Sequence, residues 1–192
     1  MPCQESDLVV TITKYWQKHL KVKHGIDSIL IYPGIEPYTA KIDYSKKVFG
    51  KISRPERGKY HDEWNYIVLD LLKMHNVYYR LISNGYNKLP IVKHKKAKYI
   101  EGVRIDQKQK RTKELSRLSI YADAHGNFKE TFCISLLEAM SCGLPCIIMG
   151  DQAMEEVLGD AGIKCKTIGE FHCRLVLLLG STAHRRELGK KA

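Results

Sequence analysis

The chain has 192 residues, of which 44% are hydrophobic and 28% are charged, and its formal net charge is +11. This composition predicts one domain with a real core, with or without a short appendage, and excludes a disordered chain, a membrane-spanning helix and a secretory signal. The basic charge favours anionic partners such as nucleic acid, anionic lipid headgroups or phosphorylated small molecules, although a solvated lysine-rich face gives the same numbers.

The first part of the chain predicts short elements and one basic loop. Strand-like runs lie at residues 9–12, 28–32 and 47–52, and helical periodicity lies at residues 14–21 and 64–72. A turn at Pro33-Gly34 ends the second of these strands. The polar segment 53–61 carries several basic side chains and is expected to form a loop.

The second part alternates strands with helices. Strands are predicted at residues 77–83, 89–92, 99–105, 120–124 and 146–149, and helices at residues 107–118, 131–142, 170–179 and 183–191. This alternation predicts βαβ units, and hence a Rossmann-like α/β/α sandwich with a mostly parallel sheet. Ligands bind such sheets at the carboxyl ends of the strands, so function is expected in the loops at residues 51–61, 83–86, 101–105 and 125–133.

Six cysteines are present, and no pair has the two-residue spacing of a zinc knuckle or a dithiol redox motif. Most of them lie in or beside apolar runs, which indicates buried reduced thiols and a reducing compartment such as the cytoplasm. No cluster with metal-ligand spacing is visible, and no cofactor or metal is expected. The eight histidines are scattered, and we assign none as a catalytic base, although His125 lies close to the expected site.

Two glutamates at the helix of residues 131–142 stand out. Glu130 opens this helix, and Glu138 lies about two turns further on, near the same face. Unpaired amides at the helix start suit a phosphate, and each carboxylate can accept hydrogen bonds from sugar hydroxyls. The expected donor contacts at this helix start are Thr131, Phe132, Cys133, Ile134 and Ser135. The structural alternative is a glutamate that merely favours a helix N-terminus and a second, surface-exposed or paired one.

Residues 130–145 resemble the E-x7-E signature of retaining GT-B glycosyltransferases of the group 1, or family 4, type. The matching positions are Glu130, Phe132, Glu138, Ala139, Met140, Gly143 and Pro145. The sequence departs from the family pattern at Cys133, where the family usually has glycine. A side chain at this position would crowd the sugar or alter the donor preference.

The resemblance extends to other segments. Residues 48–54, which include Gly50, resemble the family's strand ending in G-R, with a lysine beyond; the family's Arg and Lys hold the donor diphosphate. Arg54 and Lys59 are our preferred pair, and Lys51, directly after the glycine, is the alternative. A solvated basic loop is the commoner fate of such residues. Weaker likenesses place Ser83 and Asn84 near the nucleotide, and Gly102 and Val103 at the base.

The resemblance implies that residues 28–192 form the C-terminal donor-binding domain, and that residues 1–27 are the end of an N-terminal domain. The implied reaction transfers a sugar from a nucleoside diphosphate to a glycan or lipid-linked acceptor, with retention of configuration. Glu130 would orient the sugar and Glu138 the ribose, while Arg54 and Lys59 would stabilise the departing diphosphate. Without an N-terminal GT-B domain as partner, the chain is expected to be inactive. A peripheral contact with an anionic membrane is a further expectation.

Rival interpretations remain open. The lysines at residues 93–98 and 108–113 would suit a basic nucleic-acid-binding α/β module, although no recognised motif supports it and no specific nucleic acid is expected. A GT-B-type epimerase half, another α/β enzyme or an inactive scaffold half would share the fold. The glycine-rich loop of a dinucleotide-binding domain is absent from the first βα turn.

Overall fold

The computed structural model describes residues 8–54, 56, 58–83, 89–101, 103–104 and 106–192. Its centre is a six-stranded sheet in which all neighbouring strands run parallel, in the order β5-β4-β3-β6-β7-β8. The strands are β3 (Lys47–Ile52), β4 (Val77–Ile82), β5 (Ala97–Ile100), β6 (Ile120–Ala124), β7 (Cys146–Met149) and β8 (Ile163–Lys164). The predicted parallel α/β sheet is therefore confirmed.

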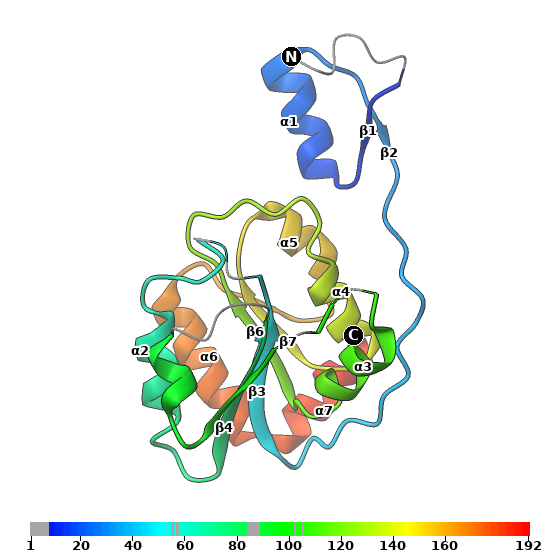
Figure 1. The fold of residues 1–192 in the computed structure, drawn as a ribbon. Helices are drawn as coiled ribbons and strands as arrows, with labels where there is room; N and C mark the ends of the chain where they lie inside the picture. Colours follow the sequence, from blue (N-terminus) through cyan, green and yellow to red (C-terminus); the bar gives the residue numbers. More distant parts are fainter. Residues whose placement is uncertain (1–7, 55, 57, 84–88, 102, 105) are drawn as a thin grey trace.

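The strand order reverses at the middle of the sheet (Figure 1). The chain proceeds outward from β3 to β5, returns to the other side of β3 with β6, and then proceeds outward to β8. Loops on either side of such a switch point lead in opposite directions and leave a crevice between them. The ends of β3 and β6 are therefore where a ligand site is expected.

Helices cover both faces of the sheet (Figure 1). One face packs against α2 (Trp64–Leu71), α6 (Ile168–Gly180) and α7 (Thr182–Lys191), and the other against α3 (Lys108–Leu115), α4 (Ile134–Ser141) and α5 (Gln152–Leu158). A hydrophobic core lies on each face of the sheet. Alternate residues of a strand contribute to the two cores, because successive side chains point to opposite faces. Thus Phe49 and Leu81 lie in the first core, whereas Ile52 and Ile82 lie in the second.

A small unit precedes the sheet. It consists of β1 (Val10–Thr11), α1 (Lys14–His24) and β2 (Ile29–Leu30), and β1 pairs in parallel with β2 in a sheet of its own. The Thr13 hydroxyl caps the start of α1, and Gly25, with φ 67°, ends it. Residues 31–46 then run along the outside of the domain to the start of β3 (Figure 1).

Several sequence-based predictions differ from the structure. Residues 89–92 were expected to be strand-like but lie largely in a 3₁₀ helix (Pro90–Lys93), because proline cannot donate to a sheet and suits the first turn of a helix. The predicted strand at residues 99–105 is displaced toward the N-terminus, since β5 ends at Ile100. Helix α5 and strand β8 were not predicted; both are short, and Asp151 caps α5 by accepting from the Met154 amide.

Candidate donor site

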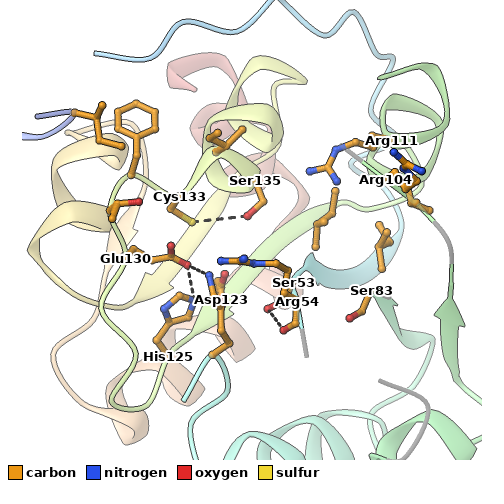
Figure 2. Close-up of a pocket in the computed structure, with 18 residues that line it drawn as sticks. Ser53, Arg54, Ser83, Arg104, Arg111, Asp123, His125, Glu130, Cys133 and Ser135 are labelled. Atoms are coloured by element: carbon orange, nitrogen blue, oxygen red, sulfur yellow. Dashed lines mark hydrogen bonds and ion pairs between the residues drawn. The ribbon is translucent and has the colours of Figure 1, made fainter. Parts of the chain in front are cut away.

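A cavity of about 560 Å³ lies at the carboxyl ends of β3, β4 and β6 and at the start of α4 (Figure 2). The four loops expected to carry function all contribute to it. Its lining comprises Ile12, Ile52, Ser53, Arg54, Lys59, Ile82, Ser83, Val103, Arg104, Arg111, Asp123, His125, Glu130, Thr131, Phe132, Cys133, Ile134 and Ser135.

Glu130 is held from several sides. Its carboxylate forms an ion pair with the Lys59 ammonium and lies 3.9 Å from His125 Nε2. Its backbone amide donates to Asp151 Oδ2 at 2.6 Å, and its carbonyl accepts from Trp16 Nε1 at 2.8 Å. The side chain is only 10% exposed. Both the backbone and the carboxylate of Glu130 are therefore fixed at the wall of the cavity.

The N-terminal unit is fastened to the same region. Glu156 of α5 accepts hydrogen bonds from the Lys14 amide (2.8 Å), the Tyr15 amide (3.1 Å) and the Tyr32 hydroxyl (2.6 Å). The Tyr32 and Phe132 rings lie 6.4 Å apart. A carboxylate at the start of α1 also stabilises the helix dipole. Through Glu156 and Trp16, the position of α1 is tied to the loop that carries Glu130.

Cys133 adopts an unusual backbone conformation at the start of α4. Its φ of 63° and ψ of 64° lie in the left-handed region, which disfavours any residue with a Cβ. This turn delays the start of α4 to Ile134, three residues after the predicted start. Burial, followed by the negative charges of Asp123 and Glu130, raises the pKa of the Cys133 thiol to about 12. At neutral pH this thiol stays protonated and is no nucleophile.

Arg54 and Lys59 both reach the cavity but in different settings. The Arg54 side chain is 70% exposed and pairs with Glu56 at 3.0 Å, and in Figure 2 it extends from the end of β3 toward Glu130. Lys59 is buried, pairs with Glu130 and lies 4.2 Å above the Phe128 ring. One cation is thus free to move toward a ligand, whereas the other is already in place beside a carboxylate.

Lys51 and Gly50 lie beneath the cavity and are not part of its lining. The Lys51 side chain is fully buried, forms an ion pair with Asp123 and donates to the Lys59 carbonyl at 2.7 Å. A Cβ on Gly50 would lie 2.1 Å from the Arg80 carbonyl oxygen, so the close approach of β3 and β4 requires glycine. Of the two pairs considered from the sequence, Arg54 with Lys59 is the pair that lies at the cavity.

Asp123 is a site residue that sequence reasoning missed. It is buried at the end of β6, between Lys51 and His125, whose Nε2 lies 3.3 Å from its carboxylate. Burial alone would raise the pKa of Asp123, but the charges of Lys51 and His125 lower it below its usual range. The Tyr121 hydroxyl donates to the same carboxylate at 3.2 Å. Asp123 is therefore a buried anion in the wall of the cavity, and an acidic residue within an apolar strand was the sequence signal for it.

The opposite end of the cavity from Glu130 carries Ser83, Arg104 and Arg111 (Figure 2), and Val103 also lines the cavity. Ser83 and Val103 were expected near the nucleotide. The two arginines were not singled out from the sequence; Arg111 lies among the lysines of residues 108–113, and Arg104 directly follows the segment 99–103. Two further expected residues, Asn84 and Gly102, lie outside the described residues.

Glu138 is buried in α4 behind the cavity. Its carboxylate accepts from Arg111 Nε at 2.9 Å and from the Tyr38 hydroxyl at 2.8 Å, and it also pairs with Arg111 Nη2. A carboxylate accepts about four hydrogen bonds, so these three leave about one position open. Glu138 therefore orients Arg111, which does line the cavity.

The fold and the cavity together define a class of protein. A doubly wound parallel sheet whose switch point holds a helix N-terminus, several cations and a fixed carboxylate is the Rossmann-like architecture seen in each half of a GT-B enzyme. The sequence profile of the family described as "Glycosyl transferases group 1" matches residues 27–192. The chain belongs to this family.

Solved structures share the fold at low sequence identity. TarM superposes with a TM-score of 0.80 and 17% identity, covering 98% of this chain and 39% of that one. Anabaena HepE in complex with UDP and glucose has a TM-score of 0.73 and 16% identity, covering 97% and 56%. The lipopolysaccharide outer core galactosyltransferase WaaB in its apo form has a TM-score of 0.68 and 14% identity, covering 96% and 57%.

The chain therefore spans between about two fifths and three fifths of the length of these three solved chains. No curated protein sequence matches it. Within the described ranges, no group of three or more His, Cys, Asp or Glu side chains is placed to hold a metal ion. The helices described also include none that is long and apolar enough to cross a bilayer.

Proposed function

We propose that this chain is the donor-binding half of a retaining glycosyltransferase, which transfers a sugar from a nucleoside diphosphate to a glycan or lipid-linked acceptor. The observation that carries the proposal is the cavity at the switch point, where Arg54, Lys59 and the start of α4 surround the space next to Glu130. Helix N-termini and fixed cations are the groups that bind a diphosphate.

The order of residues along the cavity supports one orientation of the donor. The sugar lies at the Glu130 end, and the diphosphate lies at the start of α4, within reach of Arg54. The nucleoside lies at the far end, beside Val103 and Arg111. The cavity volume of about 560 Å³ falls in the range of small-molecule sites and is large enough for a sugar, a diphosphate and a nucleoside in this order.

The chemistry follows from charge development. As the bond from the anomeric carbon to the phosphate breaks, negative charge builds on the departing diphosphate; Lys59 and the α4 amides are already in place to stabilise it, and Arg54 moves toward it from the end of β3. Glu130 accepts hydrogen bonds from sugar hydroxyls. Glu138 remains our candidate for the ribose, either directly through its open acceptor position or through Arg111. Lys51 is a positioning residue that supports Asp123 and the Lys59 backbone.

The acceptor is expected to bind between this chain and an N-terminal domain, since GT-B enzymes place the active site between two such halves. The first 27 residues are proposed as the end of that domain. Trp16 and Glu156 then transmit the position of the N-terminal domain to Glu130. Alone, the chain binds donor weakly and transfers little or no sugar.

The test is a calorimetric titration of the chain with nucleoside diphosphates. UDP comes first, because HepE was solved with UDP-glucose and a TarM mutant with UDP. We expect UDP, or another nucleoside diphosphate, to bind and its parent nucleoside to bind more weakly. Arg54→Ala should weaken binding by about tenfold or more, the value of a lost hydrogen bond to a charged group, without lowering stability.

Arg186→Ala is the matched control, since Arg186 is exposed on α7 and away from the cavity. If no nucleoside diphosphate binds, or if the two arginine variants bind alike, the proposed donor site is wrong. Salt-dependent binding of random oligonucleotides that survives Glu130→Ala would favour the nucleic-acid interpretation instead.

A further inference from the structure

A second hollow lies on the sheet, away from the donor cavity, and the two share no lining residue. It has a volume of about 500 Å³ and lies over the amino-terminal parts of β4 and β5, beside the C-terminal end of α3. We call it the basic groove. Its lining comprises Lys46, Val48, Tyr78, Tyr79, Arg80, Lys95, Lys96, Ala97, Lys98, Ser116 and Arg117.

The groove exists because α3 is short. On β4, Arg80 lies two residues before Ile82, so both side chains point to the sheet face that α3 and α4 cover. Arg80 pairs in register with Lys98 of the neighbouring strand, which places two cations side by side. Helix α3 ends at Leu115, whose side chain packs over the carboxyl-terminal half of this face and leaves the other half open.

The groove has a surplus of positive charge. Six of its lining residues are lysine or arginine, and none of the described lining residues is acidic. Glu114 pairs with both Arg80 and Arg117, and Asp43 pairs with Lys46 at 3.3 Å. These two carboxylates cannot balance the set, although Lys96 turns away to donate to the Leu72 and Met74 carbonyls.

Arg80 supplies an independent sign of a missing ligand. Its side chain is 13% exposed, and its Nη2 pairs with Glu114. Its Nε is buried and has no hydrogen-bond partner among the described residues. A buried N–H group without a partner is unfavourable, so an anionic oxygen bound beside Arg80 would add a favourable contact.

The shape and the aromatic content indicate the kind of anion. A neighbouring hollow of about 360 Å³ shares Lys46, Val48 and Tyr78 with the groove, so the two form an elongated track. The Tyr78 ring is 45% exposed and offers a flat apolar surface to the C–H face of a sugar. Single-stranded nucleic acid is bound by several successive aromatic platforms, and the described lining offers one exposed ring.

We propose that the basic groove holds a glycan chain that carries phosphate, sulfate or carboxylate groups, and that this chain is the polymeric acceptor of the reaction. This proposal rests on the proposed function. Along β4 the groove is lined by residues 78–80 and the donor cavity by Ile82 and Ser83, so their centres lie roughly 12 Å apart along the strand at about 3.3 Å per residue. A glycan of a few sugars spans that distance, and binding at the groove raises its concentration at the donor site.

The experiment measures binding of a heparin dodecasaccharide, used as the anionic glycan probe, to the full chain by titration at two salt concentrations. We expect binding that weakens as salt rises, and a heparin disaccharide should bind much more weakly. Lys95→Glu/Lys98→Glu should weaken dodecasaccharide binding by about tenfold or more, because two exposed charges in the groove are reversed. Tyr78→Ala should weaken it by a few fold, about the value of one aromatic contact.

Lys164→Glu/Lys190→Glu is the matched control, with the same charge change on exposed residues of β8 and α7. This control should leave the affinity for the dodecasaccharide within about twofold of the wild type. UDP should bind equally well to the wild type and to both lysine double variants. Equal weakening by the two double variants would overturn the proposal, as would tighter binding of polyuridylic acid or of phosphatidylserine vesicles than of heparin. If no nucleotide binds but the glycan responds to the variants as expected, the proposed donor site and the acceptor role are wrong, and the groove is a glycan-binding site alone.

Discussion

At the scale of single residues, Cys133 shows how one backbone conformation sets the site. The chain must turn sharply after Phe132 so that α4 presents its first amides to the cavity, and the turn places Cys133 in the left-handed region. Glycine adopts this conformation without the steric cost that a Cβ brings. This is the physical reason for glycine in the family pattern, and Cys133 keeps the turn at the cost of strain.

Comparison of two substitutions at Cys133 tests this account. Cys133→Ala keeps the Cβ and the strain, whereas Cys133→Gly removes both, and each loses the thiol. We expect the glycine variant to be more stable than the alanine variant by about 1 kcal/mol, measured by urea unfolding. An alanine variant as stable as the glycine variant would mean that the turn is not strained.

At the scale of elements, α7 fixes the position of two other helices. Arg185 is fully buried and donates to the Leu178 and Leu179 carbonyls at the end of α6 and to the Tyr44 carbonyl. The last carbonyls of a helix have no partner within it, so Arg185 caps α6. Gly189 lets α7 approach the turn that follows α4, since a Cβ there would lie 2.4 Å from the Gly143 carbonyl oxygen.

Two helical glycines make a matched test of this packing. Gly189→Ala should destabilise the protein by about 1–3 kcal/mol, because α7 must move away from Gly143 and Tyr44. Gly180→Ala in α6 should stabilise it by about 0.5–1 kcal/mol, because a Cβ at Gly180 has no neighbouring atom within 4 Å and alanine favours the helix. Urea unfolding of both variants checks the prediction, and a similar effect at the two sites would contradict it.

At the scale of the whole molecule, buried titratable groups define how stability depends on pH. Burial is the first cause that raises the pKa of Cys133, Cys142 and Cys165, each to about 12. The folded state therefore holds these protons where unfolded thiols, with a pKa of about 8.5, release them. Stability that these thiols contribute is present below about pH 8.5 and is lost as the pH rises toward 12.

Lys51 has the opposite effect on stability. Burial lowers its pKa, so a rise in pH favours the folded state at this group. The three buried thiols outnumber it. We therefore expect the free energy of unfolding, measured in urea with a reductant, to fall between pH 8 and pH 10.5. Cys142→Ala should make this fall shallower. Cys173→Ala, which replaces an exposed thiol, should leave the slope as in the wild type. A flat profile for the wild type would contradict the expectation.

Asp123 determines the acid side of the same profile. Its pKa is lowered in the folded state, so its contribution to stability is present above about pH 4 and is lost as the pH falls further. Together with the thiols, this predicts that the protein is most stable in the middle of the pH range, where Asp123 is ionised and the thiols are protonated.

Local sequence patterns were enough to predict most of the architecture. Apolar runs such as residues 120–124 and 146–149 fill both cores, so they stand out as buried strands, and periodic helices such as α2 were found by their spacing. The segment from Glu130 to Pro145 indicated the family because a helix N-terminus, its cap and the following strand are all local in sequence. Short elements such as β8 were not predicted, because a strand of two residues is too short to show a periodic pattern of apolar residues.

The contacts between charged residues, in contrast, follow from the three-dimensional fold. Lys51 and Asp123 are 72 residues apart, and so no spacing rule relates them, yet neighbouring parallel strands bring them into contact. The same holds for Glu138 with Arg111, for Trp16 with the Glu130 carbonyl and for the cations of the basic groove. Sequence patterns report the face of each element, whereas the order and register of strands determine which faces come together, because those depend on packing of the whole chain.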